Sequence, residues 1–95
     1  MINVTDHTQN AKVFKALCDS KRLVVLEILR RGEHCACDII DETGIAQSAL
    51  SYHMKILVES GIVESWQVGK WTHYKISRNG KETAFSLIEQ LLYTE

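Results

Sequence analysis

The sequence predicts a mainly α-helical domain with one small β-hairpin, and two observations support this fold class. Apolar side chains recur at helical spacing before residue 60 and again after residue 80. Between these helical regions, residues 62–77 are rich in β-branched and aromatic side chains around a central Gly69-Lys70, which is typical of a hairpin. The 95 residues contain no proline and no low-complexity segment, so we expect a single domain over residues 1–95.

Two helices are expected in the first third of the chain. After a loose N-terminus at residues 1–8, the first helix should cover residues 9–18, where Val13, Phe14 and Leu17 have helical spacing. Asp19 is a suitable N-cap for the second helix, and Gly32 should end it. The residues of the second helix that should point inward are Leu23, Leu26 and Leu29.

A helix-turn-helix is expected over residues 35–59. A short third helix should begin near residue 35 and end at Gly44, and a fourth should run over residues 47–59, closed by Gly61. Its buried face is set by the i, i+4, i+7 spacing of Leu50, Met54 and Leu57. The side chains left facing outward are Gln47, Ser48, Ser51, Tyr52 and Lys55.

The hairpin at residues 62–77 would stand beside the fourth helix as a wing, giving a winged helix-turn-helix. A last helix over residues 80–93 has a wide apolar surface that one small domain does not cover. We therefore expect a homodimer through the first and last helices, 9–18 and 80–93. The residues expected at this interface are Val13, Phe14, Leu87, Ile88, Leu91 and Leu92.

The charge distribution is uneven. The formal net charge is −1, which alone argues against a strongly basic nucleic-acid binder. Residues 44–78, however, contain four Lys or Arg and two Glu, so this segment carries +2 and the rest of the chain −3. The segment that would meet DNA phosphates is thus the positive one. Because neither a signal-peptide pattern nor a long apolar run occurs, we expect a cytoplasmic protein without a membrane partner.

Cys35 and Cys37 are the candidate metal ligands. Thiolates prefer soft, thiophilic ions, and two of them separated by one residue can bind the same ion. Residues i and i+2 of a regular helix do not face each other, so this chelate needs a frayed or distorted start of the third helix. A helix N-terminus also favours the thiolate form. Metal binding would then reshape the helix that supports the fourth one.

Four stretches together resemble the ArsR/SmtB family of winged-helix metal-sensing repressors, over roughly residues 10–93. Three of them are residues 15–22, 46–57 and 69–75. The most specific is Glu33-His34-Cys35-Ala36-Cys37-Asp38-Ile39, which is similar to the family's metal box. The resemblance implies a repressor that binds double-stranded operator DNA and needs no organic cofactor. The residues expected to contact DNA are Gln47, Ser48, Ala49, Ser51, Tyr52, His53, Lys55 and Lys70.

The resemblance further implies arsenite or antimonite as inducer, with cadmium and lead as other candidates. No cysteine precedes Cys18, which favours the arsenite type. Cys18 itself is expected to be a buried structural thiol, or a third sulfur ligand if the third helix swings toward it. The sequence departs from the family pattern at Ile40, where a third cysteine often stands, and at Ala46, where a serine usually caps the recognition helix.

Other interpretations of the same residues remain open. The repressor could respond to oxidation of Cys35 and Cys37, or to a sulfur species, in place of a metal. An enzymatic dithiol centre is disfavoured because no catalytic motif accompanies the cysteines. A structural zinc site is disfavoured because three cysteines without a Cys-x2-Cys pair do not supply four closed ligands. His53 and His73 could each be either a phosphate contact or an ordinary surface imidazole.

Overall fold

The computed structural model describes residues 1–95 and contains five α-helices, one 3-10 helix and three short strands. The elements in chain order are a 3-10 helix (Val4–His7), α1 (Thr8–Ala16), α2 (Ser20–Leu29), β1 (His34–Cys35), α3 (Ala36–Thr43), α4 (Gln47–Glu59), β2 (Val63–Val68), β3 (Trp71–Ile76) and α5 (Arg78–Leu92). This is the mainly α-helical winged helix-turn-helix that the sequence predicts. The first residues, expected to be loose, include the 3-10 helix, which buries no side chain.

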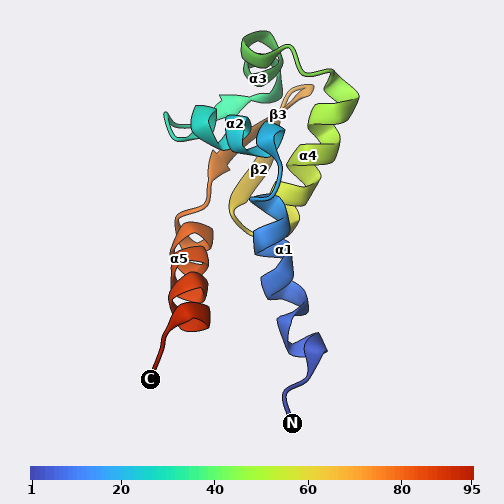
Figure 1. The fold of residues 1–95 in the computed structure, drawn as a ribbon. Coiled ribbons are helices and arrows are strands. Elements are labelled where there is room, and N and C mark those ends of the chain that lie inside the picture. Colours follow the sequence, from blue (N-terminus) through green and yellow to red (C-terminus); the bar gives the residue numbers. More distant parts are fainter.

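The molecule is elongated, with extents of 48 × 23 × 23 Å. Both α1 and α5 point toward the end of the molecule at which the two chain termini lie (Figure 1). The opposite end carries α3 and the beginning of α4 (Figure 1). None of the helices combines the length and the hydropathy that a membrane-spanning segment needs.

The sheet has three antiparallel strands in the order β1-β3-β2. The predicted hairpin is present, and its β2 and β3 pair from Val63↔Ile76 to Val68↔Trp71 around a turn in which Gly69 has φ +62°. The sequence did not predict β1, which pairs His34 with Tyr74 and Cys35 with His73. A two-residue strand is too short to leave a pattern of alternating polarity.

A single cluster of 13 buried residues forms the core, and every α-helix contributes to it. Leu50, Met54 and Leu57 of α4 are at most 2% exposed, which confirms the predicted buried face of this helix. Helix α4 is therefore fixed against the rest of the domain along one side, and its other side is free.

Helix α2 faces the core with a different set of residues from the one predicted. Leu29 is buried as expected, Leu26 is partly buried, and Leu23 is 49% exposed, so its predicted inward position is wrong. The buried residues of α2 are Arg22, Val25, Ile28 and Leu29. The helix is thus rotated relative to the predicted face, and Arg22 takes an inward position, where its guanidinium donates hydrogen bonds to two backbone carbonyls.

Asp19 caps α2, as predicted, and its carboxylate accepts hydrogen bonds from the backbone N–H groups of Lys21 (2.8 Å) and Arg22 (3.3 Å). Desolvation raises the pKa of Asp19, but the backbone hydrogen bonds from Arg22 and Lys21 and the charge of Arg22 outweigh this effect. The pKa of Asp19 in the folded protein is therefore lower than its ordinary value.

This shift makes the contribution of the cap dependent on pH. A lowered carboxyl pKa stabilises the fold above the unfolded-state pKa of about 4, and the stabilisation is lost as the pH falls through the folded-state pKa. Asp19→Asn keeps a capping side chain that does not titrate. In urea unfolding, we expect the parent's advantage over Asp19→Asn to be constant above about pH 5 and to shrink below about pH 4. An advantage that does not change on acidification would contradict this role.

Candidate functional site

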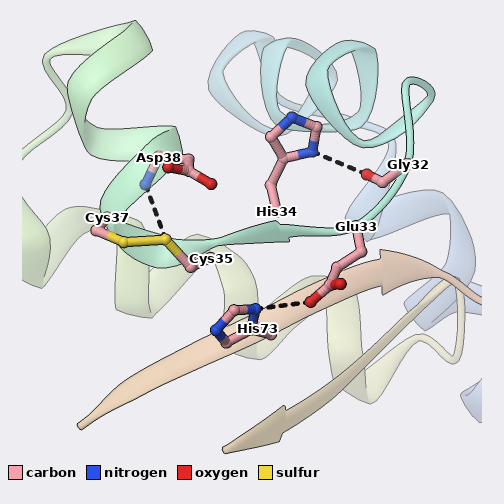
Figure 2. A network of polar contacts seen from close by, with 7 residues as sticks. All are labelled: Gly32, Glu33, His34, Cys35, Cys37, Asp38 and His73. Carbon is pink, nitrogen blue, oxygen red and sulfur yellow. Dashed lines mark hydrogen bonds and ion pairs between the residues drawn. A yellow bond between two sulfur atoms is a disulfide. The ribbon is translucent and has the colours of Figure 1, made fainter. Parts of the chain in front are cut away.

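Cys35 lies where β1 meets α3. Its backbone is extended (φ −79°, ψ 160°), it pairs with His73 of β3, and it is also the N-cap of α3. Its Sγ accepts a hydrogen bond from the backbone N–H of Asp38 at 3.2 Å (Figure 2). The residue is 7% exposed. The predicted helix start at Cys35 is thus wrong by one residue, because Cys35 precedes the helix as strand and cap.

The extended conformation of Cys35 brings its sulfur to that of Cys37. The two sulfurs are joined as a disulfide, with a Cα–Cα distance of 5.3 Å (Figure 2). On a regular helix, side chains two residues apart point in different directions. Here only Cys37 is helical, so the two side chains can face each other although they are two residues apart. A metal ion can bind the pair only in its reduced, dithiol form.

Three residues form the group of His, Cys, Asp and Glu side chains that could hold a metal ion, namely Cys35, Cys37 and Asp38. Their candidate ligand atoms lie within 4.8 Å of one another. Two sulfur donors suit a soft ion, and the exposed carboxylate of Asp38 adds an oxygen donor. Cys18 is outside this group, and its thiol is free and exposed, so the expectation of a buried structural thiol is wrong.

Two histidines lie close to the cysteines in sequence or in space. His34 projects from the opposite side of β1 to Cys35, and its Nδ1 donates to the carbonyl of Gly32 at 2.8 Å (Figure 2). His73, on β3, donates from Nδ1 to the carboxylate of Glu33 at 2.6 Å (Figure 2). Neither imidazole belongs to the group of candidate metal ligands.

The outer face of α4 is the candidate DNA-reading surface. Ala46, at the N-cap of α4, makes no side-chain capping bond, as its side chain predicts. Lys70 is exposed at the hairpin turn, and Ala49 is partly buried. The polar and aromatic side chains predicted to face outward are all exposed, namely Gln47, Ser48, Ser51, Tyr52 and Lys55.

His53 is not on that surface, so its expected role as a DNA contact is wrong. It is 7% exposed, and its Nδ1 accepts a hydrogen bond from the guanidinium of Arg22 at 2.9 Å. Arg22 also donates to the carbonyls of Lys15 (2.9 Å) and Ala16 (3.2 Å), so one buried side chain connects α1, α2 and α4. In the sequence, the only indication that Arg22 is buried is its position on the same helical face as Val25 and Leu29.

The expected dimer surface divides into two sets of residues. Val13 and Leu87 are buried in the core of the single chain and are not available to a partner. The remaining expected residues are exposed, and Phe85, 68% exposed, lies on the same helix as most of them. The exposed apolar residues of α1 and α5 are Phe14, Phe85, Ile88, Leu91 and Leu92.

Comparison with known proteins identifies relatives of this chain. The family model of bacterial regulatory proteins of the arsR family matches residues 19–65, from the cap of α2 into β2. The arsenical resistance operon repressor of Bacillus subtilis (strain 168) is 39% identical over 79 residues, which cover 82% of this chain and 73% of that protein. The repressor of the same name from Escherichia coli (strain K12) is 35% identical over 80 residues, covering 83% and 68%.

The fold also matches a solved structure. The solution structure of a homodimeric winged helix-turn-helix DNA-binding domain from Mycobacterium bovis superposes with a TM-score of 0.71. The two sequences are 30% identical, and the match covers 87% of this chain and 77% of that one.

Proposed function

The chain belongs to the ArsR family of bacterial regulatory proteins, and we propose that it is a repressor that binds operator DNA as a homodimer and leaves it when As(III) or Sb(III) binds Cys35 and Cys37. Its fold and its relatives are those of transcriptional regulators, not of enzymes. The relatives from Bacillus subtilis and Escherichia coli are named as repressors of arsenical resistance operons, which supports the choice of inducer.

The observation that supports the proposal most strongly is the position of the cysteine pair between the two DNA-binding elements. Cys35 is paired through its backbone with β3 of the wing, and Cys37 is in the first turn of α3, which packs beside α4. An ion that binds both sulfurs therefore acts on the wing and on the helix-turn-helix together.

Release from DNA follows from coupled binding equilibria. If the metal-bound conformation fits the operator less well, the metal weakens DNA binding by the same factor by which DNA weakens metal binding. Such factors are typically about 5- to 150-fold. A titration of the reduced protein on a labelled inverted-repeat fragment tests the proposal when arsenite, antimonite, cadmium, lead and zinc are added separately. We expect arsenite and antimonite to release the DNA at the lowest concentrations, whereas release by none of the five ions would contradict the proposal.

The Cys35–Cys37 disulfide favours a second candidate function, in which oxidation of the pair is itself the signal. Two thiols lose two protons and two electrons to an oxidant such as a peroxide when they form this bond. The two candidates differ in one experiment. Release by arsenite in the presence of strong reductant supports the metal switch, and release by peroxide alone, reversed by reductant, supports the redox switch.

Gln47 and Lys70 should contribute to DNA binding in different ways. An amide at the start of a recognition helix can read a base edge, whereas a lysine at the wing tip meets phosphate. We expect Gln47→Ala to cost about 1 to 3 kcal/mol on the operator and to relax specificity. Lys70→Ala should weaken binding to all sequences alike and reduce the salt slope by about one unit. Equal losses of affinity for operator and random DNA in Gln47→Ala would show that Gln47 does not read the base sequence.

The exposed apolar surface of α1 and α5 should hold a second copy of the chain. Two equivalent α4 helices would then read half-sites spaced by about 10 base pairs or a multiple of this. In sedimentation at micromolar concentration we expect a dimer for the parent and a monomer for Leu91→Glu, since burying an unpaired carboxylate is unfavourable. Val68→Glu, in the wing, is a control of similar exposure and should remain dimeric. A parent that sediments only as a monomer, with and without DNA, would contradict the dimer.

A further inference from the structure

The cysteine that would bind the metal is physically connected to the wing by β1. In the register of the sheet Cys35 is opposite His73, and His73 is in turn opposite Trp66 of β2. Residues directly opposite one another in an antiparallel sheet project from the same face. Cys35, His73 and Trp66 therefore form one row across all three strands, and the rings of His73 and Trp66 are stacked with centroids 6.0 Å apart.

Glu33, the first residue of the metal box, lies beside this row and contacts it through His73. Its carboxylate is two residues before Cys35 and accepts the hydrogen bond from His73 Nδ1 at 2.6 Å (Figure 2). A carboxylate can only accept, so this contact fixes the orientation of the imidazole. The first residue of the metal box is thereby linked to the middle of the wing strand β3, 40 residues further along the chain.

The contact between Glu33 and His73 adds little to the stability of the fold. The side chains of His73 and Glu33 are 25% and 49% exposed, and pairs with this much solvent contribute little to the stability of a fold. The contact is nevertheless well placed to transmit a movement, because Glu33 directly precedes β1 and its carboxylate holds His73 of β3, so a shift of β1 acts on β3 through this side chain as well as through the backbone. Lys70, at the turn before β3, would move with that strand.

We propose that the Glu33–His73 contact transmits metal binding at Cys35 to the wing, so that Glu33 and His73 are positioning residues of the switch. This inference rests on the proposed function and specifies one route of its coupling. When the ion binds, Cys35 and β1 shift, Glu33 carries His73 with it, and the wing leaves the position in which Lys70 meets the DNA backbone.

The experiment compares Glu33→Ala with Glu42→Ala in the reduced protein. Each substitution removes one carboxylate that is about half exposed and is paired with a basic side chain, so their effects on net charge are equal. For each protein, operator affinity is measured with and without arsenite, and the ratio gives the coupling. Arsenite affinity is measured separately without DNA, by competition with a small dithiol chelator.

We expect Glu33→Ala to bind arsenite within about twofold of the parent but to lose at least about threefold in coupling, a loss that is measurable against the usual range of about 5- to 150-fold. Glu42→Ala should keep the coupling of the parent. Unchanged coupling in Glu33→Ala, equal losses in both variants, or a loss of arsenite affinity in Glu33→Ala would each overturn the inference. A parent that arsenite does not release from DNA would overturn the proposed function itself, and this inference with it.

The fluorescence of Trp66 provides a second measurement. If Glu33 only stabilised the fold, its substitution would not change the response of this fluorescence to arsenite. In a Trp71→Phe background, Trp66 is the one remaining tryptophan. We expect arsenite to shift the emission of Trp66 in this background and to have little effect once Glu33→Ala is added. The same shift with and without Glu33 would contradict the transmission of the signal through this row.

Discussion

Cys35→Ser and Cys37→Ser should each still bind the operator but no longer leave it when arsenite is added. A hydroxyl is a poor ligand for a soft ion, so the coupling factor of about 5 to 150 should fall to about one. Folding should be preserved, because serine is a strong N-cap and can accept the hydrogen bond that Cys35 Sγ accepts from Asp38. Gel shifts of the reduced proteins, with and without arsenite, measure the effect. A serine variant that is released like the parent would show that the pair is not the sensor.

Cys18→Ser is the matched control for these two substitutions. Its thiol is exposed and outside the group of candidate ligands, so we expect the variant to respond to arsenite like the parent. X-ray absorption of the arsenite complex, in a buffer without free thiol, counts the sulfur ligands directly. Two As–S bonds are expected. Three bonds that fall to two in Cys18→Ser, together with lost release from DNA, would make Cys18 a ligand.

Gly80→Ala should strongly destabilise the domain by pushing α5 away from the rest of the fold. A Cβ atom at this position would overlap the carbonyl oxygen of Gly61 and lie 2.7 Å from its carbon, and these are backbone atoms that cannot rotate away. We expect a loss of about 3 kcal/mol or more, at the upper end of the usual cost of overpacking. For a domain of this size, that loss lowers Tm by roughly 10 °C or more.

Gly44→Ala distinguishes this steric effect from the general cost of replacing a glycine. Gly44 has φ +73° and open space around it, so its substitution should cost only about 1 to 2 kcal/mol through backbone strain. Because α5 carries four of the five exposed apolar residues of the proposed dimer surface, Gly80→Ala should also weaken the dimer, and Gly44→Ala should not. If the two variants unfold at the same temperature, the close approach of α5 to Gly61 is not important for stability.

The parts of the fold that repeat a pattern over several turns could be predicted from the sequence. Helix α4 begins and ends at the predicted residues, because Leu50, Met54 and Leu57 define its buried side and Gly61 its end. The hairpin follows from its β-branched and aromatic composition around Gly69. For the site, the sequence identified the cysteine pair and the outward face of α4, since both depend on local spacing.

The parts that could not be predicted depend on contacts between residues far apart in the chain. The pairing of β1 with β3 joins residues about 40 positions apart, and it changes Cys35 from a helical residue into a strand residue and cap. The burial of His53 depends in the same way on Arg22, 31 residues earlier. From the sequence of either helix alone, a histidine on α4 and an arginine on α2 would each be predicted to lie on the surface. Their burial follows only from the packing of the two helices against each other.

The most direct test of the proposed switch measures two pairs of affinities on the reduced protein. The operator is first selected from a random DNA library. The affinity of the protein for this operator is measured with and without saturating arsenite. Its affinity for arsenite is then measured with and without saturating operator. We expect arsenite to weaken operator binding by about 5- to 150-fold and operator to weaken arsenite binding by the same factor, because the coupling free energy is shared. Arsenite that binds Cys35 and Cys37 and leaves operator affinity unchanged would contradict the proposed function.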